Sequence, residues 1–582
     1  MLLTSEEFDQ MARSLALSPG GDVGFDVETT GLRPYQGSKA FLLGFTDTKG
    51  EKFSVKLLPD SPPHESLRLL FSNPKITYCA HNAKFELGFL DAQFGIRVLG
   101  FVWDTEVNAR IECNIHFSYN LQACALRIGE SKYQAMLDWL KERGNKNAYH
   151  LAPEAIITPY VEQDAWLSWR LRKHQCEIFT HWDTSSPVKI RNVVTLEKTV
   201  LPHLFEMERS GLLVDVAYCK RAEEYEQREI ERAKTTFLEL SGTPFVDSRK
   251  TLQPVFDRNG ICYGKTELGN ASFTEASVAA SKDHALVRTL LAHRRAVKRL
   301  SAYWQNFLEL ENNGIIHPSI NQNRAQTGRM SISDPSCQNW ATDEDDGTSF
   351  PIRRAFIARP DCFIASLDYS QMELRKASDE AEDHPMIERI LSGADLHQEV
   401  ADAAGVPRSL AKNGRFAQQY GAGIPKIAET LGVDITIART ISDAIAEQAK
   451  ATTAYSRYLG NMAKHSFGYD WLGRRFYFDH GFEYKAFNYR IQGGCAEILK
   501  IAICDIGPFL KKHASEQTFM IVPIHDEIVL NMHEKDKNLL PEIKRLMIGA
   551  HRDKKTLAMD VNIAIGPNFH DLTEYLCEKS SA

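Results

Sequence analysis

Carboxylates gather at three places in the first third of the chain. Asp26 and Glu28 alternate along GFDVETTGL, and residues two apart on a strand project from the same face. Two further pairs lie four residues apart, which places each pair on one side of a helix: Asn82 with Glu86, and Tyr160 with Asp164. These carboxylates and the phenol suit two divalent ions about 3.5–4 Å apart, which would activate a water for phosphodiester cleavage.

Two more carboxylates stand far apart in the second half of the chain. Asp368 ends an apolar run in FIASLDY, and Asp526 lies at the His-Asp tip of FMIVPIHDEIVL, a pattern that predicts a hairpin. If the strands are neighbours in one sheet, the two carboxylates could hold two magnesium ions for nucleotidyl transfer. Glu527 would then lie beside them as an auxiliary carboxylate.

A helix with a basic and aromatic side is predicted between these two carboxylates. Arg408, Lys412, Phe416 and Tyr420 recur every four residues in PRSLAKNGRFAQQYGAG, and this spacing keeps the four side chains on one side of a helix. Two cations followed by two aromatic rings could bind a nucleotide, phosphates first and base after. The spacing equally fits an amphipathic helix whose basic residues extend to solvent.

The elements that must position these residues fall into three stretches. Residues 22–28 and 41–56 read as short strands, and helix and strand signals alternate to about residue 171, which predicts an α/β domain. The segment HWDTSSPVKI is the best candidate for a linker. From about residue 191 the pattern is helical to about 310, and beyond Gly314 strands and helices mix.

Composition limits the class of protein. The chain of 582 residues needs several domains, and 43% hydrophobic and 25% charged residues are ordinary globular values. No apolar run is long enough to cross a membrane and no signal peptide is evident, so we expect a cytoplasmic protein. The eleven scattered cysteines predict neither disulfides nor a zinc site. Although the net charge is −7, seven basic and two acidic residues between 288 and 329 form either a stripe that tracks phosphates or a solvated helix face.

The first group of carboxylates resembles the three motifs of the DEDD-type 3′→5′ exonucleases, in the subgroup with tyrosine in the third motif. The resemblance implies metal binding by Asp26, Glu28 and Asp164, orientation of the attacking water by Tyr160, and exonuclease roles for Asn82 and Glu86. The second motif commonly carries aspartate where this chain has Glu86. Because the longer side chain can still reach a metal from a slightly withdrawn helix, we expect an active exonuclease.

The second group resembles motifs A, B and C of the DNA polymerase I family in residue type, order and spacing. The match extends to TGRMSISDPSCQN, IRRAF, DLHQEVA and NYRIQGG, so the two resemblances cover nearly the whole chain. It implies that Asp368 and Asp526 bind metal and that Glu527 and Lys412 are further catalytic residues, Lys412 by protonating pyrophosphate. The nucleotide-binding residues would be Arg353, Glu373, His397, Arg408, Lys412, Phe416 and Tyr420. The DNA-binding residues would be Arg329, Asn339, Asn488, Gln492 and His525.

Three of these DNA-binding residues are expected at the primer end. Arg329, Asn488 and Gln492 would read the minor groove, whose hydrogen-bond acceptors are shared by every correct base pair. The family often has arginine four residues before Asn488, whereas this chain has Tyr484, which leaves that contact open.

The resemblance also implies the fold and the partners. We expect a ribonuclease H-like α/β exonuclease domain over residues 1–185 and an α+β right-hand polymerase domain over 186–582. Within the latter, the thumb would span about 190–312, the palm about 313–395 and 485–582, and the fingers about 396–484. Each active site would bind two Mg²⁺ ions, with Mn²⁺ as a substitute. The substrates would be primer–template DNA, dNTPs and a single-stranded 3′ end.

Some partners and domains are expected to be absent. The chain starts almost directly with the exonuclease, so we expect no 5′ nuclease domain. The region between Phe237 and Asp247 is short, which predicts no thioredoxin-type processivity subunit. We also expect a monomer with no membrane partner. The layout resembles a phage enzyme, which would act in the host cytoplasm.

Two other functions compete with this interpretation. A single-subunit RNA polymerase would share the two aspartates and the basic and aromatic helix, but Glu373 argues against it, because in the DNA-polymerising family this position excludes the sugar 2′-hydroxyl. An inactive accessory subunit that only clamps DNA would have lost its metal-binding carboxylates. Asp368 and Asp526 are both present, which argues against the second alternative.

Overall fold

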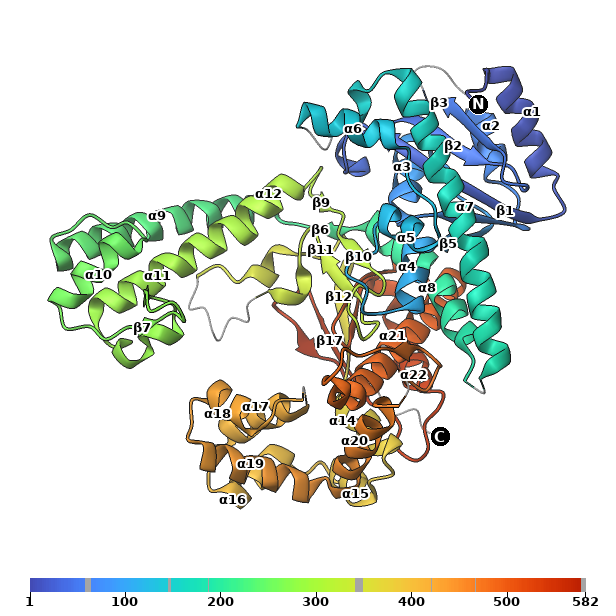
Figure 1. Cartoon of the computed structure of the whole chain (residues 1–582). Helices are drawn as coiled ribbons and strands as arrows, with labels where there is room; N and C mark the ends of the chain where they lie inside the picture. Colours follow the sequence, from blue (N-terminus) through green and yellow to red (C-terminus); the bar gives the residue numbers. More distant parts are fainter. Residues whose placement is uncertain are drawn as a thin grey trace.

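The N-terminal part of the chain folds around a five-stranded sheet, shown in blue and cyan in Figure 1. The computed structural model describes residues 1–57, 64–144, 148–186, 188–340, 349–419, 421–465 and 467–576. The strands, in the spatial order β3-β2-β1-β4-β5, are β1 (Gly21–Thr29), β2 (Ala40–Thr46), β3 (Lys52–Lys56), β4 (Ile76–Ala80) and β5 (Phe101–Asp104). Around the sheet lie α1 (Ser5–Ala16), α2 (His64–Leu70), α3 (Lys84–Phe94), α4 (Thr105–Glu112), α5 (Leu121–Arg127), α6 (Gln134–Arg143) and α7 (Glu154–Ser185).

Glycines let α7 lie directly against this sheet. A Cβ atom at Gly24 of β1 would lie 2.1 Å from the carbonyl oxygen of Ala165, and one at Gly44 of β2 would lie 2.4 Å from that of Val161. Only glycine leaves room for such an approach. The middle of α7 therefore sits over β1, the strand that carries the first pair of carboxylates. The helix continues to Ser185, so the first half of the segment expected to be a linker is helical instead.

The helix α8 (Ile190–Ser210) belongs to both halves of the molecule. Its Leu201 packs into the core of the N-terminal domain, whereas its Leu204 packs into the core beneath the central sheet. On the same helix, the buried carboxylate of Glu197 lies 2.5 Å from Lys500 Nζ and also pairs with Arg474. Apolar packing and buried ion pairs thus join the two halves through one helix.

A long helical arm extends from the centre of the molecule, green in Figure 1. It consists of α9 (Val216–Ser241), α10 (Arg249–Arg258), α11 (Ala285–Arg299), a π-helical turn (Leu300–Gln305), α12 (Asn306–Leu310) and the strands β7 (Gly264–Lys265) and β8 (Ala271–Ser272). Between α9 and α11, buried Arg299 donates hydrogen bonds of 2.7 and 2.9 Å to Glu226. Arg299 therefore takes no part in the phosphate-tracking stripe that the sequence suggested.

A second five-stranded sheet lies at the centre. Its strands, in the spatial order β15-β16-β12-β17-β18, are β12 (Cys362–Tyr369), β15 (Phe519–Ile524), β16 (Glu527–His533), β17 (Val561–Gly566) and β18 (Thr573–Glu574). All neighbouring strands are antiparallel, so the β15–β16 hairpin lies beside β12. The helices α8, α21 (Ala486–His513) and α22 (Leu540–Gly549) pack on one face, and residues of α9 and of the π-helical turn pack on the other.

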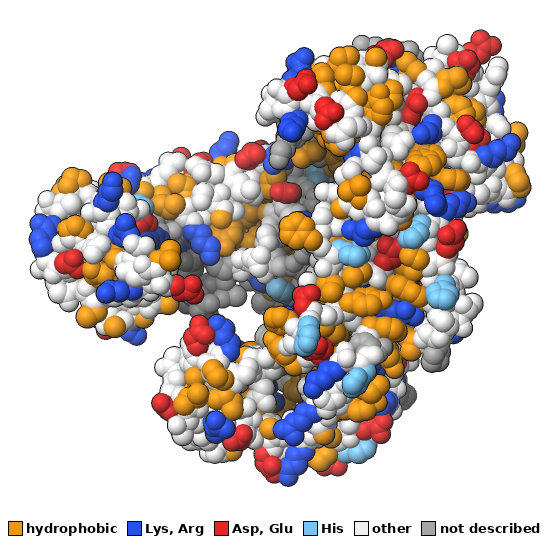
Figure 2. Space-filling view, viewed as in Figure 1, with side chains coloured by type: hydrophobic (Ala, Val, Ile, Leu, Met, Phe, Trp, Pro, Cys, Tyr) orange, Lys and Arg blue, Asp and Glu red, His pale blue; other side chains and the backbone are white. Residues whose placement is uncertain are grey.

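A second helical lobe follows β12 in the sequence. Beyond α14 (Met372–Glu380) and α15 (His384–Leu391), it contains α16 (Leu396–Ala404), α17 (Arg408–Gln419), α18 (Ile424–Leu431), α19 (Ile435–Gln448) and α20 (Lys450–Ala463). Val400, Ala411 and Ile441 form part of a separate small core for α16, α17 and α19. On the face drawn in Figure 2, the molecule is hollowed between this lobe and the arm.

Short strand pairs complete the described structure. They are β6 (Leu212–Leu213) with β9 (Ile315–Ile316), β10 (Ser319–Asn321) with β11 (Ser331–Ser333), and β13 (Gly468–Tyr469) with β14 (Arg475–Phe476). Across the residues described, every helix is too short or too polar to span a lipid bilayer.

Candidate active sites

Three carboxylates from β1 and α7 meet in the N-terminal domain. Asp26 and Glu28 project from β1, and one oxygen of each lies within 4.8 Å of the others and of an oxygen of Asp164 on α7. Asp164 Oδ1 is buried and has no hydrogen-bond partner among the described residues. Unpaired, buried carboxylate oxygens are costly unless a cation binds them. The residues therefore fit a divalent metal site.

The electrostatics of this cluster also favour a bound cation. Burial, reinforced by the charge of neighbouring carboxylates, raises the pKa of Asp26, Glu28 and Glu86 well above their ordinary values. Burial likewise raises the pKa of Asp164, although the ammonium of Lys132 opposes that shift. A divalent ion would stabilise the ionised carboxylates and reverse these shifts.

Lys132 is a member of this site that the sequence did not reveal. Its Nζ atom lies 2.5 Å from Asp164 Oδ2 and 4.5 Å from the centre of the Tyr160 ring. Burial opposes the charge of Lys132, but the carboxylate of Asp164 outweighs it, and the pKa of the lysine is raised. A single lysine in the short segment between α5 and α6 carries no sequence signal for such a role.

The second exonuclease motif is only partly as expected. Glu86 lies on α3, is buried, and its Oε2 has no hydrogen-bond partner among the described residues. Asn82, which we expected on the same helix, precedes α3 in a left-handed conformation with φ 65°. Its backbone N–H donates to Asp104 Oδ1 at 3.1 Å. The two residues are therefore not one turn apart on a helix.

A cleft of about 540 Å³ opens beside Asn82, between the N-terminal domain and the central part of the molecule. Arg33 and Lys84 line it from one side and Arg324 from the other. At its wall the ring of Tyr35 stacks on that of His317, with centroids 4.1 Å apart. Cations and aromatic rings of this kind suit a single nucleic-acid strand.

Three carboxylates lie close together at one end of the strands β12 and β16 of the central sheet. Asp368 of β12 is opposite Glu527 of β16 in the strand register, and Asp526 occupies the turn just before β16. Burial and the charges of Glu527 and Asp526 raise the pKa of Asp368 to about 6. Burial also raises the pKa of Asp526, against the opposing charge of Arg329. The hairpin predicted from the sequence thus brings two distant segments together.

Arg329 bridges two of the expected polymerase residues. Its guanidinium forms an ion pair with Glu373, which lies in the first turn of α14, and it lies 3.9 Å from Asp526 Oδ1. A left-handed residue, Gln371, ends the turn between Asp368 and this helix. The expected sugar-contacting residue and the expected minor-groove residue are therefore in direct contact.

The helix α17 carries the basic and aromatic residues. Arg408, Lys412 and Phe416 are exposed, whereas Ala411 and Arg415 face the interior of the lobe. Arg408 Nε donates to Asp395 Oδ2 at 2.8 Å, and the ring of His397 on α16 lies 6.1 Å from that of Phe416. Tyr420 lies outside the described residues.

The remaining expected contacts lie around the same end of β12 and β16. Arg353 lies in a short 3-10 turn after Pro351. Burial raises the pKa of Glu527, and the charge of Arg353 opposes that shift. His525 Nε2 lies 2.9 Å from the carbonyl oxygen of Gln338, which places it beside Asn339. On α21, Asn488 Oδ1 is buried with no hydrogen-bond partner among the described residues, and Gln492 is buried one turn further on.

This arrangement, a carboxylate-bearing central sheet flanked by two helical lobes and joined to a second carboxylate-bearing α/β domain, is that of a nucleic-acid polymerase with an attached nuclease. Residues 216–571 match the family described as DNA polymerase family A, and residues 1–174 match the family described as 3′-5′ exonuclease. The chain therefore belongs to DNA polymerase family A. The family and the two-part fold expected from the motifs are confirmed.

Relatives from bacteria and from phages are similar along most of this chain. DNA polymerase I of Chloroflexus aurantiacus is 27% identical over 597 residues, which cover 94% of this chain and 61% of that protein. The DNA polymerase of Mycobacterium phage L5 is 27% identical over 535 residues, which cover 87% of this chain and 86% of that protein. The chain thus spans less than two thirds of the bacterial relative and most of the phage one.

A solved structure shares the fold. It is described as the POL domain of Pol1 from M. smegmatis in complex with DNA primer-template and dNTP. Its TM-score is 0.79 at 22% sequence identity, over 98% of this chain and 99% of that one. At this identity the likeness concerns the fold.

Proposed function

We propose that this chain extends the 3′ end of a primer on template DNA with dNTPs and removes 3′-terminal nucleotides at a separate site. The observation that carries the proposal is that Asp368, Asp526 and Glu527 lie at the same end of neighbouring strands of the central sheet, in a chain that belongs to DNA polymerase family A. The second carboxylate cluster, in the part that matches the exonuclease family, supports the second activity.

Divalent ions are part of this proposal. Magnesium bound at each site, or manganese in its place, would lower the pKa of the attacking hydroxyl or water and stabilise the leaving oxygen. Asp368 and Asp526 would hold two ions at the polymerase site, with Glu527 beside them. Asp26, Glu28 and Asp164 would hold two at the exonuclease site, with Glu86 withdrawn behind them.

The residues of α17 and its surroundings would bind the incoming nucleotide. Lys412 is exposed on the same side as Arg408, so both can contact the triphosphate, and Lys412 can donate a proton to pyrophosphate. Arg353 and His397 would contact further phosphate oxygens, and Phe416 would pack near the sugar and base. Glu373 would occupy the space of a 2′-hydroxyl, and Tyr420 would extend the same helix face.

The DNA-binding residues would hold the primer end over the carboxylates. Arg329, Asn488 and Gln492 would donate hydrogen bonds to acceptors in the minor groove, which do not differ between correct base pairs. Asn339 and His525 would contact the strand nearby. At the exonuclease site, Tyr160 would orient the attacking water, and Asn82 with the adjoining cleft would hold the single-stranded 3′ end.

We propose the following organisation for the molecule. Residues 1–185 form the exonuclease domain and residues 186–582 the polymerase domain, with the thumb at about 190–312, the palm at about 313–395 and 485–582, and the fingers at about 396–484. The arm α9–α12 lies within this thumb, and α16–α20 within these fingers. The protein would act as a monomer in the cytoplasm, without a thioredoxin-type subunit.

A primer-extension assay tests both activities. With magnesium and dNTPs a labelled primer on a template should lengthen, and without dNTPs it should shorten from its 3′ end. Asp526→Asn should stop lengthening only, whereas Asp26→Ala combined with Glu28→Ala should stop shortening only. Loss of both activities in either variant, with unchanged circular dichroism, would contradict the assignment of two separate sites.

A further inference from the structure

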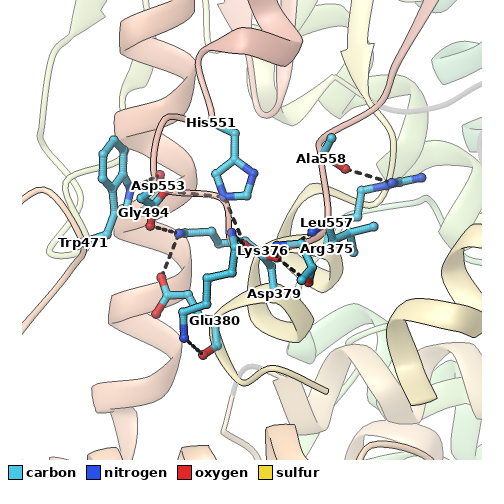
Figure 3. A network of polar contacts seen from close by, with 12 residues as sticks. Arg375, Lys376, Asp379, Glu380, Trp471, Gly494, His551, Asp553, Leu557 and Ala558 are labelled. Atoms are coloured by element: carbon cyan, nitrogen blue, oxygen red, sulfur yellow. Dashed lines mark hydrogen bonds and ion pairs between the residues drawn. The ribbon is translucent and has the colours of Figure 1, made fainter. Parts of the chain in front are cut away.

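A buried network of charges lies at the end of α14 that is remote from the polymerase carboxylates (Figure 3). The side chain of Lys376 is fully buried, and its Nζ lies 3.0 Å from Glu380 Oε1 and 2.5 Å from Asp553 Oδ2. It also lies 5.5 Å from the centre of the Trp471 ring. A buried lysine with no carboxylate partner would be very costly, so this position needs its two acids.

Within this network, one carboxylate joins three helices. Glu380, at the end of α14, accepts hydrogen bonds at Oε2 from Tyr455 of α20, at 3.1 Å, and from Arg490 of α21. Its other oxygen faces Lys376 of its own helix. Burial opposes the charge of Glu380, but Lys376 and Arg490 outweigh it and lower its pKa, so the group is an ionised carboxylate at neutral pH.

Two further carboxylates anchor the same region. Asp379 accepts backbone N–H groups of Lys555, Thr556 and Leu557, at 2.7–2.8 Å, just ahead of β17, which pairs with β12. Asp383 Oδ2 accepts the backbone N–H and the hydroxyl of Thr452 on α20, at 3.0 and 2.9 Å. The end of α14 is therefore tied both to the central sheet and to the second helical lobe.

Each of the three helices that Glu380 joins leads to a different part of the proposed polymerase site. The helix α14 starts after Asp368 and carries Glu373 in its first turn. The helix α21 carries Asn488 and Gln492. The helix α20 ends the lobe that contains α17, the helix with the exposed cations. One buried carboxylate thus contacts the helices that lead to the sugar side, the minor-groove side and the phosphate side of the proposed site.

We propose that Glu380 is a positioning residue of the polymerase site. It touches neither nucleotide nor DNA, and it acts through α14, α20 and α21, by holding the sugar-facing, lobe and minor-groove helices in the arrangement that accepts a correct base pair. This inference rests on the proposed polymerase function. Tyr455 connects Glu380 to the lobe, because its hydroxyl donates a hydrogen bond from α20 to this carboxylate.

Two substitutions distinguish an effect on the arrangement of the helices from a general loss of folding stability. Tyr455→Phe removes one hydroxyl from the lobe contact and leaves the two cations of Glu380 in place. Glu380→Gln keeps the size and the hydrogen-bonding oxygen but removes the charge that Lys376 and Arg490 need. The matched control is Asp505→Asn, which breaks a surface ion pair of α21 with Arg552, at 2.9 Å, away from Glu380.

The assay measures kcat and KM for correct and for mismatched dNTPs, in a background where Asp26→Ala and Glu28→Ala stop excision. We expect Tyr455→Phe to raise KM for the correct dNTP and to reduce discrimination against the mismatch by about tenfold, the factor that one hydrogen bond to a charged group supplies. Glu380→Gln should show a larger loss in the same direction. Asp505→Asn should match the parent protein.

The outcomes are distinct for the two proposals. If the parent protein extends no primer, the proposed polymerase function is wrong. If the parent extends primers and Tyr455→Phe, folded by circular dichroism, keeps parental KM and discrimination, then Glu380 has no positioning role through the lobe. Should Glu380→Gln fail to fold, Tyr455→Phe alone decides. A fall in kcat alone, equal for correct and mismatched dNTPs, would also contradict the inference.

Discussion

The buried carboxylates of the exonuclease site predict a pH-dependent stability that magnesium should reduce. Because the pKa values of Asp26, Glu28 and Glu86 are raised in the folded, metal-free chain, that chain keeps protons that the unfolded chain releases. Below about pH 4 these carboxyls are protonated in both the folded and the unfolded chain, so they do not lower the free energy of unfolding. As the pH rises towards the pKa values that these carboxyls have in the folded chain, the free energy of unfolding falls.

The size of the effect follows from linkage. Each pH unit over which one such carboxyl is protonated only in the folded state costs about 1.4 kcal/mol. For a domain of this size, that corresponds to a fall of about 3–6 °C in melting temperature per carboxyl. Asp164 contributes less, because Lys132 already offsets its raised pKa. Magnesium at a hundredfold excess over its dissociation constant should restore about 2.7 kcal/mol.

The assay is thermal unfolding between pH 5 and pH 8, with EDTA and with magnesium, followed by a probe in the N-terminal domain. In EDTA the melting temperature of the wild type should fall as the pH rises, and the difference between EDTA and magnesium should grow. The double variant Asp26→Asn with Glu28→Gln should have a flatter profile in EDTA. Equal slopes for the wild type and the double variant would refute the reasoning.

Other substitutions test single side chains of both sites. Glu86→Ala should slow 3′ shortening by orders of magnitude whereas Glu86→Asp keeps most of it, and equal rates for wild type and Glu86→Ala would show that Glu86 is not needed. Lys132→Met should tighten Mn²⁺ binding by calorimetry about tenfold, because its ammonium competes for the Asp164 oxygen; weaker binding would contradict this. Wild type should reject ribonucleotides and dideoxynucleotides by about a hundredfold, or roughly 2.7 kcal/mol. Glu373→Ala should admit the former and Phe416→Tyr the latter, as ratios of kcat/KM; unchanged ratios would mean that these side chains do not face the sugar.

Residues that lie close together in the sequence could be placed from their spacing alone, whereas the pairing of Asp368 with Asp526 was expected only from the resemblance to the polymerase family. Asp26 and Glu28 share a strand face whatever surrounds them, and the apolar runs around Asp526 predict a hairpin. Glu380 is different, because its partners Tyr455 and Arg490 are distant in sequence and only the packing of three helices brings them together. The sequence could likewise not predict the role of Lys132, since its contact with Asp164 joins a short loop to the middle of α7.

Backbone conformation and burial account for the remaining differences. Asn82 and Glu86 have helical spacing, but the left-handed conformation of Asn82 starts the helix two residues later, at Lys84. Arg299 has the same charge as its neighbours on α11, yet it faces Glu226 across the arm and is buried. Spacing alone does not distinguish a cation that faces solvent from one that faces a carboxylate on another helix.

Under the proposed function, the double membership of α8 means that the DNA, and not the two sites, would have to move during proofreading. Since this helix supplies apolar side chains to both cores and its Glu197 is locked to Lys500, the two active sites cannot swing towards each other without breaking buried contacts. The distance between the two active sites is therefore fixed. A primer end would then reach the exonuclease site only when enough base pairs have melted to span that distance, so the stability of the terminal base pairs would decide how often a primer is checked.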